Sequence, residues 1–505
     1  MRHMVQTYSR SNRLKLNTIS SIILQFATII CGFIVPRLIL GTYGSEINGL
    51  VNSISQFLSM ISFMEMGVGA VVQSSLYKPL ADSNSFMVSS IVKSAERFFR
   101  TIAFALVGYT LLLSIILPRF VKDRFGFFFT VILIVSISCN SFFQYFIGMP
   151  ERLLLMSDQK GFITYLSQTI TLVANTAISA ALIVMGARIQ TVKMVSAFVF
   201  LIRPIFLRLY VNCHYCIDRK ISYIDEPIGQ KWNGIAQHIA AVVLDQADVV
   251  ILTLFSTLSN VSVYSVYHLI VFGIKRLFLS ALGGVQPLMG EYIAKDEKDK
   301  LASLFEWTEW LVHTGTTLLF TCAGILIVPF VRVYTNGIND ANYVVPVFAA
   351  LITIANAGHC LRLPYNIMIL AAGHYKQTQY NYIIAALLNV VISILAVHRW
   401  GLTGVAVGTV VAMIYQTIWM AYYDSKNILD FSIGEFWKHC LVDGIIALCT
   451  VASVGFLGLK EVSYSALLVL AVIKGMICFA ISAIVNTIFY RNMVKRLLMY
   501  NGNCE

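Results

Sequence analysis

Long apolar runs follow one another along almost the whole chain, and they restrict its fold more than any other feature. From Ile102 to Leu117, only Tyr109, Thr110 and Ser114 carry polar side chains. A run of this length approaches the roughly 20 residues of a helical membrane span, and it lacks the polar–apolar alternation typical of barrel strands. Because lipid satisfies no backbone polar group, the sequence predicts an all-α polytopic membrane protein.

The composition agrees with this prediction. Of the 505 residues, 58% are hydrophobic and only 12% are charged, whereas an ordinary soluble domain carries about 25% charged residues. We expect about fourteen membrane spans, and the first follows a basic segment without a cleavage site, so we expect it to be retained. The expected spans cover residues 16–40, 46–77, 88–117, 125–149, 162–186, 190–213, 232–257, 262–293, 307–334, 342–371, 377–398, 401–424, 436–458 and 463–490.

The basic residues of the connecting loops indicate the orientation of the chain. If the N-terminus is cytoplasmic, the inner loops carry 23 Lys and Arg residues and the outer loops carry eight. This bias predicts that the N- and C-termini are both cytoplasmic. It also accounts for most of the net charge of +12, so the charge does not indicate nucleic acid as a partner.

The two halves of the chain are similar to each other at an offset of about 215 residues. The segment from Lys160 to Gly186 aligns with the one from Lys376 to Gly401, and Gly69 aligns with Gly284. An even number of spans per half predicts two six-helix lobes in a parallel repeat, an architecture typical of transporters. A duplicated scaffold and a channel are the alternatives, although no segment resembles a filter loop. The predicted division is an N-terminal lobe over 1–215, a cytoplasmic linker over 216–231, a C-terminal lobe over 232–430, and two further helices with a tail over 431–505.

Polar side chains recur along one face of several spans. In a bilayer such groups are costly unless they meet a partner or water, so these stripes either line a cavity or allow helices to pack closely. The residues expected to line a cavity are Gln25, Thr28, Asn52, Ser55, Ser59 and His268. At the end of the second stripe, Glu65 is a candidate for ion coupling or charge pairing.

The spans predicted over 232–257 and 262–293 carry opposite charges. Asp245 and Lys275 each lie fifteen residues from a turn predicted near Asn260, which places them about 22 Å along their helices and at one depth. An unpaired charge at that depth would be costly, so we expect an ion pair.

This pair has two interpretations. It either holds its two helices together permanently, or it belongs to a site where Lys275 and Arg276 bind an anionic substrate. In the second case, Asp245 and Asp248, with His238 on the same helical face, neutralise the cations or bind a proton or sodium ion.

Two further arginines extend the set of candidate cations. Arg37 lies at the outer end of the first span, and Arg362 lies between Gly358 and Pro364, where the helix can be broken beside a cavity. We expect no metal and no cofactor, because the closely spaced Cys213 and Cys216 have no second ligand pair.

Several short motifs resemble a known family. They are PRLILGTYGSEINGL from Pro36 to Leu50, EMGVG from Glu65, VYSVY from Val263 and AGHYKQTQ from Ala372. They resemble bacterial polysaccharide-biosynthesis flippases of the O-antigen transporter type. These flippases belong to the multidrug/oligosaccharidyl-lipid/polysaccharide exporter (MOP) superfamily, in which two six-helix lobes and two extra C-terminal helices are frequent.

The resemblance implies a flippase that moves an undecaprenyl-diphosphate-linked oligosaccharide across the bacterial cytoplasmic (inner) membrane by alternating access. The glycan would serve surface polysaccharide assembly, transport would be coupled to a proton or sodium ion, and membrane lipid and polysaccharide assembly proteins would be partners. Cations suit a diphosphate, and the candidates are Lys275, Arg276, Arg362 and Arg37. The alternatives are a cation-coupled multidrug exporter and, less favoured because no loop is large enough for a catalytic domain, a glycan polymerase or glycosyltransferase. We therefore expect a transporter and no enzyme.

Overall fold

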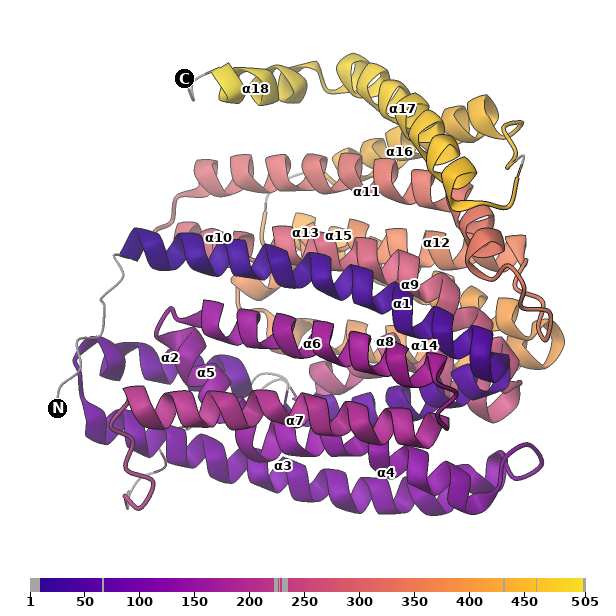
Figure 1. The fold of residues 1–505 in the computed structure, drawn as a ribbon. Helices are drawn as coiled ribbons and strands as arrows, with labels where there is room; N and C mark the ends of the chain where they lie inside the picture. Colours follow the sequence, from indigo (N-terminus) through magenta and orange to yellow (C-terminus); the bar gives the residue numbers. More distant parts are fainter. Residues whose placement is uncertain are drawn as a thin grey trace. The chain divides into compact units, whose positions relative to one another are not determined.

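The computed structural model describes residues 10–65, 68–221, 226, 228, 235–429, 432–459 and 461–502, and these residues form helices and short connections without a strand (Figure 1). The all-α prediction is therefore confirmed. The chain forms two compact units, residues 1–242 and 243–505. The finer division into lobes, linker and C-terminal helices stays a prediction.

The first unit contains α1 (Arg10–Ser59), a 3₁₀ turn (Met60–Met64), α2 (Val68–Ala81), α3 (Ser85–Phe120), α4 (Phe127–Phe143), a π-helical turn (Gln144–Gly148), α5 (Met149–Ser157), α6 (Gly161–Val184) and α7 (Ile189–His214). The unit boundary falls within α8 (Ile235–Phe255). The second unit continues with α9 (Leu258–Ala281), α10 (Val285–Ala294), α11 (Lys298–Tyr334), α12 (Pro346–Leu361), α13 (Leu363–Ala371), α14 (Tyr375–Trp400), α15 (Leu402–Asn427), α16 (Ile433–Val454), α17 (Tyr464–Phe489) and α18 (Arg491–Gly502).

Within the described residues, twelve helical segments are long and apolar enough to cross a membrane. The first, Lys15–Ser62, spans 48 residues and includes one predicted span and part of a second, because α1 continues through a kink at Gly44, where φ is 83°. With α8, which matches the predicted span over 232–257, the segments correspond closely to the fourteen predicted spans.

Some predicted boundaries were wrong. The span predicted over 46–77 is interrupted after Ser59, and the span predicted over 262–293 is interrupted between Ala281 and Val285. Apolar periodicity continues across such breaks, so it does not reveal them. The expected break at Arg362 is confirmed, since α12 ends at Leu361 and α13 begins at Leu363.

The structure repeats its backbone irregularities in the two halves. Left-handed residues end equivalent helices: Gln159 (φ 57°) corresponds to Gly373 (φ 73°), and Gly186 (φ 75°) corresponds to Gly401 (φ 51°). Helices α5 and α13 are both nine residues long, and each has a proline in its first turn, where the missing N–H costs nothing. Equivalent pairs also pack together, as α3 with α4 matches α11 with α12 and α4 with α7 matches α12 with α15. The predicted duplication is therefore confirmed.

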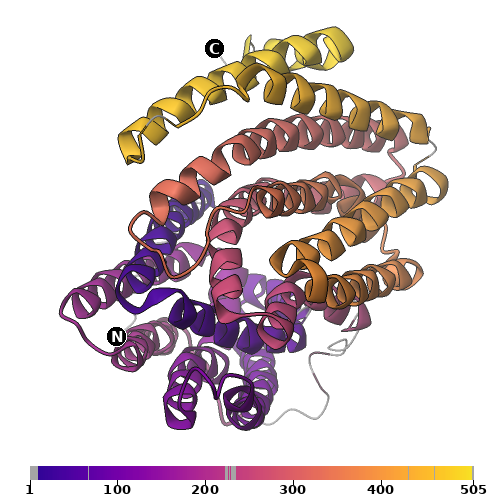
Figure 2. The ribbon, with the colours of Figure 1, turned by 90° about the vertical axis from the view of Figure 1, so that its right-hand side faces the viewer.

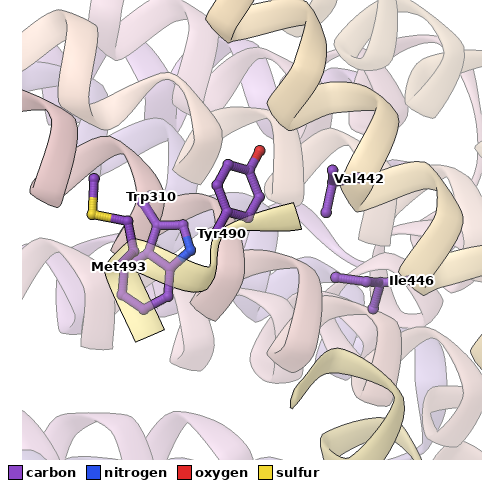
Figure 3. Close-up of a cluster of buried hydrophobic side chains, with 5 residues drawn as sticks. All are labelled: Trp310, Val442, Ile446, Tyr490 and Met493. Carbon is purple, nitrogen blue, oxygen red and sulfur yellow. The ribbon is translucent and has the colours of Figure 1, made fainter. Parts of the chain in front are cut away.

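The two C-terminal helices pack onto the repeat of their own unit. Both α16 and α17 contact α11 and each other, and Figure 2 shows them along one side of that helix. A buried apolar cluster lies there (Figure 3), formed by Trp310 of α11, Val442 and Ile446 of α16, Tyr490 at the end of α17 and Met493 of α18. At 0–8% exposure, these side chains are fully part of the core of this unit.

Helices α14 and α15 approach each other very closely because glycine lies at their contact. A Cβ atom on Gly404 would lie 2.4 Å from the carbonyl oxygen of Ala396 and 2.9 Å from the amide nitrogen of Val397. Both are backbone atoms, which cannot move aside as a side-chain end can. Small residues at such contacts allow tight packing between membrane helices.

We predict that Gly404→Ala separates α14 from α15 and destabilises the protein by about 1–3 kcal/mol, as overpacking commonly does. The measurement is the thermal unfolding temperature of the purified protein in detergent. The control is Gly444→Ala in α16, where a Cβ atom would have no neighbour within 4 Å. Equal unfolding temperatures for the two variants would contradict the prediction.

Candidate functional site

An ion pair joins α8 and α9 within the second unit. The Nζ atom of Lys275 donates a hydrogen bond to Oδ1 of Asp245 over 2.9 Å. One assumption behind the predicted pair was wrong, because α8 ends at Phe255 and α9 begins at Leu258. Asp245 is therefore nearer the turn than Lys275, so the pair does not rest on equal distances from the turn.

The two partners differ in their exposure. The Lys275 side chain is 9% exposed and that of Asp245 is 47% exposed. Protein atoms thus cover the ammonium group, while the carboxylate keeps an open side. Such a pair can exchange its anion: a ligand that reaches Asp245 can compete with it for Lys275.

Aromatic rings line the helix beside the pair. The Cζ atom of Arg276 lies 4.8 Å from the ring centroid of Phe272, and Nζ of Lys275 lies 5.9 Å from it. His268 stacks between Phe272, at 5.0 Å, and Tyr264, at 5.5 Å. Cations over a ring face are stabilised by its quadrupole, so Phe272 supports both cations of α9. Arg276 itself is exposed.

A second buried cation lies at the junction of α12 and α13. Arg362 is 6% exposed, and its guanidinium donates to the Oε1 atom of Gln416 and lies 3.1 Å from Nδ1 of His359. Its Nε atom has no hydrogen-bond partner in the described residues. Arg362 and His268 are both close enough to Asp245 to interact with its charge. Asp245 thus interacts with two buried cations: it bonds Lys275, and its charge attracts Arg362.

Asp248 has a different environment from Asp245. It is 6% exposed and accepts hydrogen bonds from the hydroxyls of Tyr264, at 3.1 Å, and Thr409, at 2.8–2.9 Å. Asn389 also contacts it. Hydroxyl and amide groups thus surround Asp248, whereas a cation bonds Asp245.

The sequence did not indicate several residues of this cluster. Thr409, Gln416 and His359 contribute directly, yet nothing in their spacing distinguishes them from other polar residues in spans. The available signal in the sequence was that Gln416 is an amide within the span predicted over 401–424. The structure shows it fully buried on α15. Their partners come from other helices, so the pattern of a single helix cannot identify them.

The candidate residues of the first unit have mostly local partners. The hydroxyls of Thr28, Ser55 and Ser59 donate to carbonyl oxygens of their own helix. Asn52 does the same toward Asn48. Their lining of a cavity stays a prediction.

Gln25 and Glu65 differ from that group. The Nε2 atom of Gln25 is buried without a hydrogen-bond partner in the described residues, and Glu65 accepts a 3.0 Å hydrogen bond from Tyr145. Arg37 is partly buried in α1, and the side chain of His238 lies outside the described residues. Their roles in ion coupling and substrate binding stay predictions.

We predict that the two partners of the ion pair respond unequally to substitution. Asp245→Asn leaves the covered Lys275 without its carboxylate, and removing one partner of a buried pair costs about 3–5 kcal/mol. Lys275→Met leaves a carboxylate that is half exposed, so it costs less. Thermal unfolding in detergent measures both variants. A larger loss in Lys275→Met than in Asp245→Asn would contradict the prediction.

Comparison with known proteins identifies the fold. No family model matches the sequence, and no curated protein matches it. Among solved structures, the chain is similar to the lipid II flippase MurJ in an inward closed conformation, with a TM-score of 0.69, 16% identity, and coverage of 94% of this chain and 100% of that chain.

Two multidrug and toxin extrusion (MATE) transporters are similar as well. The eukaryotic transporter AtDTX14 has a TM-score of 0.60 at 10% identity, over 83% of this chain and 96% of that one. An inward-facing multidrug resistance MATE transporter of the MOP superfamily has a TM-score of 0.55 at 14% identity, over 81% and 98%. The chain therefore has the fold of the MOP transporters, as the sequence resemblance implied.

Proposed function

We propose that the protein is a flippase that translocates an undecaprenyl-diphosphate-linked oligosaccharide across the bacterial cytoplasmic membrane by alternating access. Its termini lie in the cytoplasm, and its product serves surface polysaccharide assembly. The observation that carries the proposal is the excess of cations in the second unit: Lys275 bonds Asp245, Arg362 interacts with the same carboxylate, and Arg276 follows Lys275 on α9, against the two carboxylates Asp245 and Asp248. An anionic headgroup fits this imbalance.

The exposures suggest how a diphosphate would bind. Arg276 is exposed and meets the ligand first. Phosphate oxygens then replace Asp245 at Lys275, which the half-open carboxylate permits. Arg362 stays hydrogen-bonded to Gln416 and adds its positive charge to the site. In a site of low dielectric these charge interactions are stronger than in water.

A multidrug exporter is the second candidate, because MATE transporters share the fold. Export of cationic drugs would favour carboxylates without a nearby cation. Asp245 instead bonds Lys275 and lies near Arg362. Asp248 is bonded by hydroxyl and amide groups, but Lys275, Arg276 and Arg362 outnumber the two carboxylates, so the net charge favours an anionic substrate. An enzyme is disfavoured because the similar structures are transporters.

We predict that Lys275→Gln weakens binding of the lipid-linked substrate about 10- to 100-fold, since a hydrogen bond to a charged group contributes about 1.5–3 kcal/mol. The assay is translocation of a labelled undecaprenyl-diphosphate oligosaccharide in proteoliposomes, with substrate affinity measured in parallel. The matched control is Lys474→Gln in α17, which also removes a buried lysine, 5% exposed, but lies outside the cluster.

Two outcomes would contradict the flippase. Equal translocation by Lys275→Gln and wild type would exclude Lys275 from substrate binding. If a deletion strain keeps its surface glycan and becomes sensitive to cationic drugs, the exporter is correct instead.

We also propose that Asp248 binds the coupling proton or sodium ion. Its carboxylate is 6% exposed and is surrounded by the oxygens of Tyr264 and Thr409, with Asn389 nearby. Oxygen ligands suit a hard cation, and a protonated carboxyl can also use these partners. Binding at this site drives the cycle only if one state of the protein binds the ion better than the other.

We predict that Asp248→Asn abolishes the dependence of transport on ion gradients, because it removes the titratable group. Transport in proteoliposomes with imposed proton or sodium gradients measures this. The control is Thr417→Val on α15, the helix that also carries Thr409; it removes a hydroxyl that donates to the Gly358 carbonyl and makes no hydrogen bond to Asp248 among the described residues. Gradient-dependent transport by Asp248→Asn would exclude this site from coupling.

A further inference from the structure

The contact between the C-terminal helices and α11 contains a chain of buried polar groups. It lies within the second unit and shares no residue with the cluster around Lys275. At its centre, His313 of α11 is 1% exposed and places Nδ1 2.6 Å from Oδ2 of Asp443 on α16. The other oxygen of Asp443 accepts a 2.6 Å hydrogen bond from Thr317.

The second ring nitrogen of His313 also has a partner. Its Nε2 atom lies 3.3 Å from the hydroxyl of Tyr365 on α13, and that hydroxyl donates to Oε1 of Glu309 over 2.5 Å. Tyr365 is fully buried and Glu309 is 3% exposed. Helices α11 and α13 of the repeat and the C-terminal helix α16 therefore meet through one hydrogen-bonded series.

The three hydrogen bonds of this series need three protons, one more than a neutral His313 and Tyr365 supply between two ionised carboxylates. The only hydroxyl proton of Tyr365 is donated to Glu309, so Nε2 must carry a proton to bond the tyrosine oxygen. An ionised Asp443 only accepts, so Nδ1 must carry a proton as well. The observed contacts are all satisfied when His313 holds both protons between Asp443 and Tyr365. A neutral ring would satisfy the same contacts only with the extra proton on Glu309, which would then donate to Tyr365 while Tyr365 donates to Nε2.

The neighbouring histidine supports this assignment. His439 of α16 stacks on His313 at 4.8 Å, and two charged rings in that arrangement would repel each other. His439 places Nδ1 2.8 Å from the Tyr490 hydroxyl and Nε2 3.9 Å from Glu309. No carboxylate is as close to it as Asp443 is to His313. At most one histidine of the pair is therefore charged, and within the described residues His313 has the closer carboxylate.

A further carboxyl is buried beside the series. Asp424 of α15 is 0% exposed, neither of its carboxylate oxygens has a hydrogen-bond partner in the described residues, and its charge interacts with that of Glu309. An isolated buried carboxylate is too costly to remain ionised, so Asp424 carries a proton in this state. The titratable and charged groups facing the series are Glu306, Glu309, His439, Tyr365, Asp424, Glu435, Lys438, Cys440 and Tyr490.

An open cavity connects these groups to water. It measures about 720 Å³ and is lined by Glu309, His439 and Tyr490 together with the surface residues Glu435 and Lys438. The side chains of Glu435 and Lys438 are 54% and 43% exposed. Water in the cavity therefore reaches Glu309, the outer member of the series.

We propose that His313 and Asp443 form a proton-binding site that exchanges with this cavity through Glu309 and Tyr365. In uptake, a proton from water adds to Glu309. Tyr365 then gives its own proton to Nε2 of a neutral His313 and receives the proton of Glu309. The products are a histidinium held by Asp443, a neutral tyrosine and an ionised glutamate, so protons and charge balance. The site links the C-terminal helices to the repeat, and it does not depend on the proposed substrate.

The test is ¹⁵N NMR of the full-length protein with labelled histidine in lipid bilayers. Wild type at pH 7 is expected to show one buried histidine with both ring nitrogens protonated, and His313→Gln identifies it by removing the signal. Asp443→Asn is expected to lose the second ring proton. Thr317→Val, which removes only the other hydrogen bond to Asp443, is expected to keep it.

Tyr365→Phe tests the route to the cavity. It leaves Asp443 in place, so His313 is expected to keep both protons while their exchange with water slows at least tenfold. Unchanged exchange would overturn the route through Tyr365. A neutral His313 in wild type, or a doubly protonated one in Asp443→Asn, would overturn the site itself, and the wild-type spectrum decides even if that variant does not fold.

Discussion

The cost of an uncompensated charge away from water governs the arrangement of this protein. Lys275 is almost fully covered, and its position depends on the carboxylate of Asp245. Arg362 is buried without a carboxylate of its own and interacts with that same charge. These interactions link α8, α9 and the junction of α12 and α13. The Asp245 carboxylate stabilises these cations when no ligand is bound, and the remaining excess of positive charge favours binding of an anion.

Interruptions in the helices create the places where such groups meet. The fourth helix of each half is broken before a proline-containing segment of nine residues, and Arg362 lies at one of these breaks. The other half has Gly148 at the end of a π-helical turn there. The repeat thus supplies equivalent backbones, and the residue at this break is an arginine in the second half and a glycine in the first.

Two polar systems share the second unit and differ in kind. The cluster of Lys275 combines buried cations with a half-exposed carboxylate, an arrangement suited to exchange with an anionic ligand. The series around His313 is closed on almost every side and satisfies its contacts with one additional proton. Because α11, α13 and α16 all contribute to that series, its charge affects how the C-terminal helices pack on the repeat.

The sequence by itself determined the helical class, the approximate number of spans, the duplication and the pairing of Asp245 with Lys275. These follow from local periodicity and from the cost of charge in lipid, which act along one helix or between neighbouring helices. Only the tertiary structure decided that Gln416 holds Arg362 and that Thr409 bonds Asp248, since these partners are 54 and 161 residues apart. A helical face specifies that it needs a polar partner, but the packing of distant helices decides which partner it receives.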